Sequence, residues 1–328
     1  MHQNMGNKWM KLIISVALLL SSAQVMSQEA KLSVMTSIKP LQLITQEITL
    51  GVTDTQVLLS SNASPHDYAL RPSDMRKIKD ADLFIWVGPG LESFLESALE
   101  GNTNTLQLDQ SPDIIKLTYG EEGDHEHKSH DEHASHADHD HAAHNDHSHD
   151  DGHHHHGNYN PHLWLGPDQA QQMAKVISDK LITIDPKHQA EYEKNYQAFV
   201  SHLSATILEI KQELAPVKSH GYYVFHDAYS YYENYFGLNN LGHFTVSPDR
   251  RPGAKTLITI RTALQSDKAY CVFSEPQFTP AVIESVTRGT NVKHGSLDPL
   301  ATDYPIEQGS YFTFLQDLGH SFSTCLTR

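Results

Sequence analysis

Apolar runs long enough to cross a membrane are absent from this sequence of 328 residues. The run near the N-terminus, Leu12 to Leu20, has nine residues, whereas a membrane-spanning helix needs about 20. Lys8 and Lys11 precede this run and small residues follow it at 21–23, which is the order of a secretory signal. We therefore predict a signal peptide at 1–27 and a soluble, exported mature chain. An uncleaved N-terminal anchor is the alternative.

Cysteine is nearly absent, since Cys271 and Cys325 are the only two. In an exported protein they meet an oxidising compartment, in which a disulfide persists. We predict one bridge between them. On the chain-entropy model, closing a loop of this length contributes about 4 kcal/mol to stability. Two buried free thiols are the alternative.

Basic residues are also scarce, because 24 Lys and Arg stand against 40 Asp and Glu, a formal net charge of −16. Most of the acidic excess is local. Residues 121–157 carry eleven Asp or Glu and a single basic residue, Lys128. The sequence has no basic patch of the kind that binds nucleic acid. Its acidity instead favours cations as partners.

Residues 120–157 form a low-complexity segment without any aliphatic side chain larger than Ala. Such a segment cannot bury enough apolar surface to offset its ordering entropy, so we predict a disordered loop with an r.m.s. span of about 34 Å. Neutral imidazoles among carboxylates bind zinc, nickel or copper. The predicted auxiliary metal loop contains fourteen histidines: His125, His127, His130, His133, His136, His139, His141, His144, His147, His149, His153, His154, His155 and His156. A solubilising tract without metal is the alternative.

Strand-like and helix-like patterns alternate on both sides of this segment, in the order expected of parallel sheets covered by helices. Before it, the predicted strands are 32–36, 56–59 and 83–87, and the predicted helices are 40–50, 72–80 and 91–100. After it, the predicted strands are 222–225, 242–246, 270–273 and 292–296, with helices at 228–236, 254–266, 280–289 and from 309 onward. We predict an α/β fold of two lobes, 28–185 and 217–328.

The spacing of apolar residues changes in 186–216, between the two predicted lobes. Apolar side chains recur there at steps of three and four, the spacing of one stripe along a helix: Tyr192, Tyr196, Phe199, Leu203, Ile207, Ile210 and Leu214. Pro186 and Pro216 bracket the stripe, with no Gly or Pro between them. We predict one stiff helix of about 42 Å that links the lobes.

Three histidines outside the loop lie in contexts that favour a ligand. His66 follows the predicted strand 56–59, His162 precedes a helix that opens at Pro167, and His226 directly follows the strand 222–225. Open α/β sheets bind their ligands on loops of this kind. Taken singly, each of the three is more often an ordinary polar loop residue.

At these histidines the sequence resembles a known family. Five segments carry the resemblance: Ser-Pro-His-Asp-Tyr-Ala-Leu-Arg-Pro-Ser-Asp at 64–74, Pro-His-Leu-Trp-Leu at 161–165, Val-Phe-His-Asp-Ala-Tyr at 224–229, Ser-Glu-Pro-Gln-Phe at 274–278 and Leu-Asp-Pro-Leu at 297–300. They are similar to those of the periplasmic zinc receptors (ZnuA type) of zinc-uptake ABC transporters, within the cluster of metal-receptor solute-binding proteins. The likeness runs from the signal peptide to the last helix.

The resemblance implies a function and a site. It implies a periplasmic, monomeric, non-enzymatic receptor that captures Zn²⁺ and delivers it to an inner-membrane ABC permease. The metal would lie in a cleft between two α/β lobes joined by one long helix. Its ligands would be His66 and His162 from the first lobe and His226 from the second.

The fourth ligand is where the sequence departs from part of the family. Some zinc receptors have Glu directly before the first ligand histidine, but here that residue is Pro65, which has no side-chain donor. Asp298 aligns with a carboxylate ligand of related receptors, and either Asp298 or a water would complete a zinc tetrahedron. We favour the water, with Asp298 close by. Asp67 and Asp227 adjoin ligand histidines and are candidates for contacts around the site.

Other functions remain as alternatives. The metal site of a zinc hydrolase also has three histidine ligands and an open position, but hydrolysis needs a general base. Glu275 is the candidate base in this sequence, and no His-Glu-x-x-His motif is present. An envelope-attached adhesin of the same cluster would need a lipoprotein cysteine after the apolar run, and the first cysteine is Cys271. A periplasmic metal store would not need two lobes around a buried site.

Overall fold

The computed structural model describes residues 31–60, 62–118, 159–246, 248, 251–266, 268–278 and 281–327. The predicted signal peptide and the predicted histidine loop lie outside these residues. From Leu32 onward the chain forms one compact unit. Within the described ranges, no helix combines the length and the apolar character of a membrane span.

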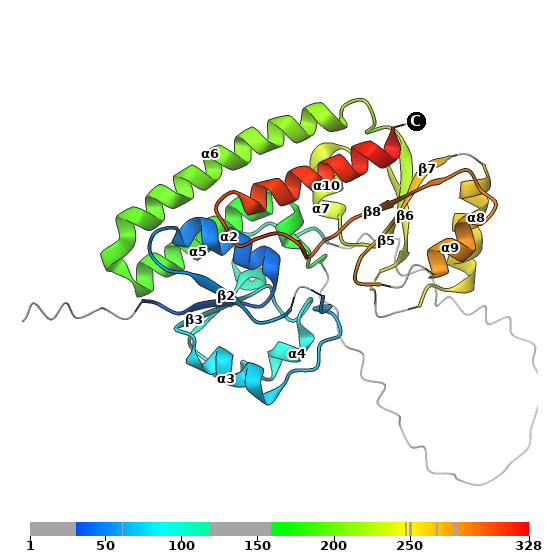
Figure 1. Cartoon of the computed structure of the whole chain (residues 1–328). Coiled ribbons are helices and arrows are strands. Elements are labelled where there is room, and N and C mark those ends of the chain that lie inside the picture. Colours follow the sequence, from blue (N-terminus) through cyan, green and yellow to red (C-terminus); the bar gives the residue numbers. More distant parts are fainter. Residues whose placement is uncertain are drawn as a thin grey trace, which may run out of the picture. The chain divides into compact units, whose positions relative to one another are not determined.

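The first sheet has four parallel strands in the order β2-β1-β3-β4 (Figure 1). The strands are β1 (Val34–Thr36), β2 (Thr55–Val57), β3 (Leu83–Trp86) and β4 (Thr105–Gln107). The helices among them are α2 (Lys39–Thr49), α3 (Pro72–Asp80) and α4 (Ser93–Glu96). β1 and β3 are buried along their whole length, as expected of apolar strands in a parallel sheet. The three predicted strands are confirmed, and β4 has no counterpart in the prediction.

The second sheet repeats this arrangement, with parallel strands in the order β6-β5-β7-β8. Its strands are β5 (Gly221–His226), β6 (Asn240–Thr245), β7 (Ala269–Ser274) and β8 (Lys293–Ser296). Its helices are α7 (Ser230–Phe236), α8 (Ala254–Gln265), α9 (Ala281–Thr287) and α10 (Ser310–Leu326). All four predicted strands and all four predicted helices are confirmed, with ends shifted by a few residues.

Two long helices connect the sheets. α5 (Pro167–Ile184) follows the short 3-10 turn η3 (Leu163–Leu165), and α6 (Gln189–Leu214) follows the 3-10 turn η4 (Pro186–His188). α6 packs against α2 and α5 on the side of the first sheet and against α10 on the side of the second (Figure 1). The predicted linking helix is thus confirmed.

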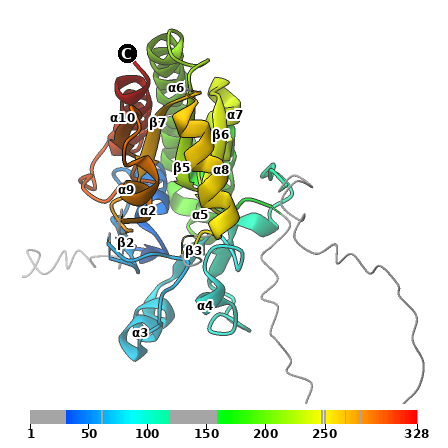
Figure 2. The ribbon, with the colours of Figure 1, turned by 90° about the vertical axis from the view of Figure 1, so that its right-hand side faces the viewer.

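The apolar stripe of α6 explains this packing. Phe199 and Leu203 are each 1% exposed, and the ring of Phe199 lies 5.7 Å from that of Tyr311 and 5.2 Å from that of Phe312, both on α10. The buried residues of both sheets join through this region into one hydrophobic core. A second, smaller core lies under α8 and α9, which cover the opposite face of the second sheet (Figure 2).

A disulfide fastens the last helix to the second sheet. Cys271 of β7 and Cys325 of α10 are bonded, with their Cα atoms 5.8 Å apart. The predicted bridge is therefore present in the structure. It holds α10, the helix that packs against α6, to the sheet that carries His226.

Candidate metal centre

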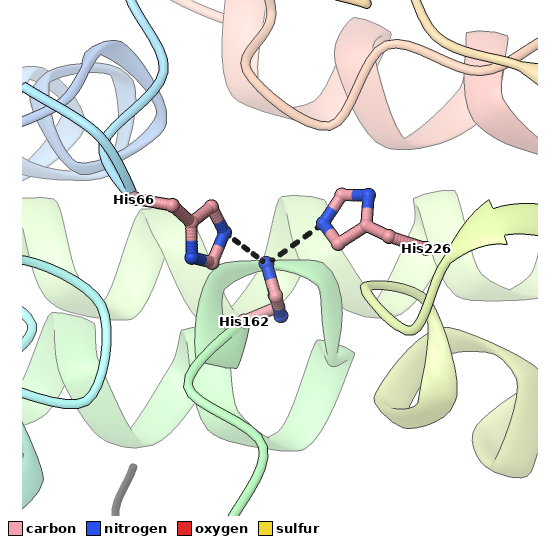
Figure 3. Close-up of side chains that lie close together, drawn as sticks. All are labelled: His66, His162 and His226. Carbon is pink, nitrogen blue, oxygen red and sulfur yellow. Dashed lines mark hydrogen bonds between the residues drawn. The ribbon is translucent and has the colours of Figure 1, made fainter. Parts of the chain in front are cut away.

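Three histidine side chains converge where the two sheets present their carboxyl ends (Figure 3). His66 lies on the loop after β2, His162 directly precedes η3, and His226 is the last residue of β5. Parallel sheets bind ligands at this edge because the loops that follow their strands meet there. Residues far apart in the sequence therefore become neighbours.

Their Nε2 atoms point toward a common centre. The Nε2 of His162 lies 3.2 Å from the Nε2 of His66 and 3.2 Å from the Nε2 of His226. His162 is 3% exposed and His226 is 2% exposed, while His66 is partly buried. Within the part of the chain that the structure describes, these three residues are the group of possible ligands whose donor atoms all lie within 4.8 Å of one another.

Contacts on the far side of two rings fix which nitrogen carries the proton. The Nδ1 of His226 lies 2.6 Å from Oε1 of Glu275, and the Nδ1 of His162 lies 2.7 Å from Oδ1 of Asn160. Because both oxygens are acceptors, each Nδ1 donates a hydrogen bond. In a neutral ring of this tautomer, Nε2 keeps a lone pair directed at the centre, which is the form that binds a metal.

Two lone pairs that face each other at 3.2 Å repel unless a proton or a metal cation lies between them. Burial, with smaller effects of His226 and His66, holds the pKa of His162 well below its ordinary value of 6.5. A proton is therefore disfavoured at this ring. The arrangement therefore suits a cation coordinated by neutral imidazoles.

The surroundings of the three rings are largely apolar. Trp164, Phe278, Pro299 and Leu300 line the same cavity as the histidines. The indole Nε1 of Trp164 donates to the carbonyl oxygen of Pro299 at 2.7 Å, which fixes the loop that closes one side of the cavity. Such a shell restricts access of water to a bound metal.

Asp298 lies in this loop, but its carboxylate is occupied by hydrogen bonds. Oδ1 accepts from Nε2 of Gln277 at 2.7 Å and from the backbone N–H of Leu300 at 3.0 Å, and Oδ2 accepts from the N–H of Thr302 at 2.6 Å. The structure therefore brings the three predicted histidines together, while the Asp298 oxygens bind the loop 298–302. Pro65 lines the cavity through its apolar ring.

Asn160 and Glu275 hold the rings of His162 and His226, and the sequence did not single out either residue for this role. Asp227, which it did consider, instead accepts a hydrogen bond from Ser230 through its side chain. A signal for Glu275 exists, because it follows β7 at the same sheet edge at which His226 ends β5. For Asn160 the only signal is its position two residues before His162.

Four further histidines have other surroundings. His188 bonds Asp185, the ring of His202 lies 4.0 Å from that of Phe312 at a tilt of 30°, and His320 bonds Glu213. His220 stacks on Tyr270, with ring centroids 4.1 Å apart. The fourteen histidines of the predicted metal loop lie outside the described residues.

Comparison with known proteins identifies relatives of the whole chain. The family model of the periplasmic zinc-uptake complex component A, ZnuA, matches residues 34–325. The high-affinity zinc uptake system protein ZnuA of Yersinia pestis is 45% identical over 333 residues, which cover 98% of this chain and 98% of that protein. The corresponding protein of Haemophilus ducreyi is 48% identical over 301 residues, which cover 91% of this chain and 94% of that protein.

Solved structures share the fold. A crystal structure of ZnuA has a TM-score of 0.71 at 23% identity, and the alignment covers 91% of this chain and 100% of that one. A zinc-bound ZnuA from which residues 138–173 of its own numbering are deleted also has a TM-score of 0.71, at 22% identity, with 91% of this chain and 99% of that one covered.

Proposed function

The chain belongs to the family of the periplasmic zinc-uptake complex component A, ZnuA, and from this membership we propose how its own residues serve zinc uptake. Proteins of this family are zinc-binding, non-enzymatic transport components of the periplasm. We propose that His66, His162 and His226 form the site at which this chain captures Zn²⁺. The observation that carries the proposal is the convergence of one ring nitrogen from each histidine, all within 4.8 Å of one another.

Zinc suits this donor set. Zn²⁺ prefers four ligands in a tetrahedron, and three neutral imidazoles supply three of them at Zn–N distances of about 2.0–2.1 Å. Metal affinity requires unprotonated rings, and the low pKa of His162 provides one at neutral and mildly acidic pH. The apolar wall formed by Trp164 and Phe278 offers water no hydrogen-bond partner beside the three rings, apart from the indole N–H that bonds Pro299.

For the fourth ligand we propose a water molecule, with Asp298 as the alternative. To reach the metal, Asp298 would have to give up hydrogen bonds to Gln277, Leu300 and Thr302. Charge-assisted bonds of this kind each contribute about 1.5–3 kcal/mol, which opposes that movement. A water needs no such rearrangement.

The cargo then passes to the rest of the uptake complex. We propose that the partner is an inner-membrane ABC permease and that the receptor acts as a monomer. We also propose that the histidines of 120–157 collect zinc near the site without forming it.

Single alanine substitutions test the site. In a background without residues 121–156, His66→Ala, His162→Ala and His226→Ala should each weaken tight zinc binding by about a hundredfold or more, roughly 2.7 kcal/mol, in a competition titration. His320→Ala is the matched control, because His320 bonds only exposed partners on α6 and α10 and should leave the affinity unchanged. Wild-type affinity in any of the three variants would remove that residue from the site.

A further inference from the structure

Asn160 stands out as a buried polar residue whose groups are all engaged around the centre. Its side chain is nearly inaccessible, with the residue 2% exposed. Its Oδ1 accepts two hydrogen bonds from His162, one from the backbone N–H at 3.1 Å and one from Nδ1 at 2.7 Å. One amide oxygen therefore fixes both the main chain and the ring of a ligand.

The other half of the amide reaches the second sheet. Nδ2 of Asn160 donates to the carbonyl oxygen of Asp227 at 2.8 Å, and Asp227 directly follows His226. Because Nδ2 must donate to this carbonyl, the amide cannot be turned around, and Oδ1 necessarily faces His162. The segments that carry His162 and His226 are thus joined through one planar group.

The main chain of Asn160 is fixed as well. Its N–H donates to the carbonyl oxygen of Leu117 at 2.8 Å, and its carbonyl oxygen accepts from the hydroxyl of Tyr231 on α7 at 2.7 Å. The same hydroxyl accepts from the N–H of Leu117 at 3.0 Å. Asn160 therefore cannot shift without disturbing contacts from both halves of the chain.

We infer that Asn160 is a positioning residue that sets the spacing and the ring orientation of His162 and His226 and thereby holds the site in a tetrahedral arrangement. This inference rests on the proposed zinc site. Preorganised ligands bind more tightly because no ordering is required when the ion arrives. A loosened pair of imidazoles would bind zinc less tightly and would admit other coordination geometries.

Two substitutions separate the parts of this role. Asn160→Asp keeps an acceptor for His162 but replaces the donor to the Asp227 carbonyl by an oxygen that repels it. Asn160→Ala removes both contacts. We expect zinc affinity to fall by about 10- to 100-fold in Asn160→Ala, the usual effect of removing a hydrogen bond from a metal-bound histidine, and to fall in Asn160→Asp as well.

Asn195→Asp is the matched control. The Nδ2 of Asn195 also donates to backbone carbonyls, those of Ile48 and Leu50, but on α6 rather than at the site. We expect its zinc affinity to equal that of the wild type. Circular dichroism identifies any variant that is not folded, and Asn160→Asp, which preserves the size of the side chain, then decides the question.

Cobalt absorption supplies a readout that a merely structural role would not change. Co²⁺ bound to the wild type should show the strong visible bands of a tetrahedral ion, and these bands should weaken and shift in both Asn160 variants. Wild-type affinity and wild-type cobalt bands in folded Asn160→Ala, or in Asn160→Asp if the alanine variant does not fold, would overturn the inference. If instead His162→Ala bound zinc as the wild type does, the proposed site itself would fail, whatever the Asn160 variants showed.

Discussion

At the scale of single residues, burial controls the charge of His162, one of the three proposed ligands. Its ring is buried, two further imidazoles face it, and its pKa lies well below the ordinary 6.5. In an unfolded chain the same ring takes up a proton near pH 6.5. Between these two pKa values the unfolded protein binds more protons than the folded protein.

This difference predicts how the stability of the zinc-free protein depends on pH. As pH falls below about 6.5, His162 should lower the free energy of unfolding by up to about 1.4 kcal/mol per pH unit, until the pH reaches the folded pKa. Replacing His162 by Ala removes this contribution. Urea unfolding of both zinc-free proteins between pH 7.5 and 5 measures it, and equal slopes with pH would contradict the prediction.

The sequence predicted the three converging histidines but not the residues that hold their rings. Each of these histidines lies in a segment that resembles a known family, and two of them follow strands, where the loops of a parallel sheet meet. Glu275 and Asn160 lie beside the rings only because of side-chain direction, which residue spacing does not determine. Asp298 illustrates the same limit, since its carboxylate binds its own loop.

At the scale of elements, α6 depends on its apolar stripe. Phe199 is 1% exposed and packs against Tyr311 and Phe312, whereas Leu208 on the same helix is 61% exposed. Phe199→Ala should lower the free energy of unfolding by about 3–5 kcal/mol, because it leaves a cavity between α6 and α10. Leu208→Ala, the control, should change it by less than about 0.5 kcal/mol. Chemical denaturation compares them, and similar losses would argue against the packing described.

The predictability of elements follows from their length and period. α6 was identifiable because seven apolar residues repeat over about six turns, a pattern that chance rarely produces. The predicted helix 91–100 is only α4, Ser93–Glu96, partly because the Glu92 carboxylate accepts hydrogen bonds from Val87 and Gly88 and holds the chain in a loop there. β4 has three half-buried residues and exists through its pairing with β3, a contact that no local pattern encodes.

At the scale of the whole molecule, α6 limits how the two sheets can move. Asn195 of α6 bonds the end of α2, while Glu209 and Glu213 of α6 bond α10. Domains that close by large rotations do so about loop-like hinges, which a continuous packed helix is not. Small-angle scattering profiles of zinc-free and zinc-loaded protein should therefore be nearly the same. A large compaction on loading would refute this prediction.

The last prediction concerns the histidine-rich residues 120–157, which we propose to be auxiliary to the transport site. The chain on either side of them is held together without them, because Thr118 and Tyr159 pair in an isolated antiparallel bridge. Removal of Glu121 to His156 would leave four residues between these partners, Tyr119, Gly120, Gly157 and Asn158. Loops of four residues built around a turn are common in hairpins, so the deletion should be compatible with the fold.

The deletion separates two roles for these histidines. Ligands spread along a low-complexity sequence must be ordered each time they close around an ion, so their sites should be weaker than one preformed by His66, His162 and His226. We expect the protein without Glu121 to His156 to lose its weak zinc-binding equivalents and to keep one tight zinc per chain. Cells that carry it should grow poorly only when zinc is scarce. If a histidine of the loop instead completed the tetrahedron, the tight site itself would weaken. A competition titration decides between the two, and a loss of tight affinity beyond about tenfold, roughly 1.4 kcal/mol, would show that the loop belongs to the transport site.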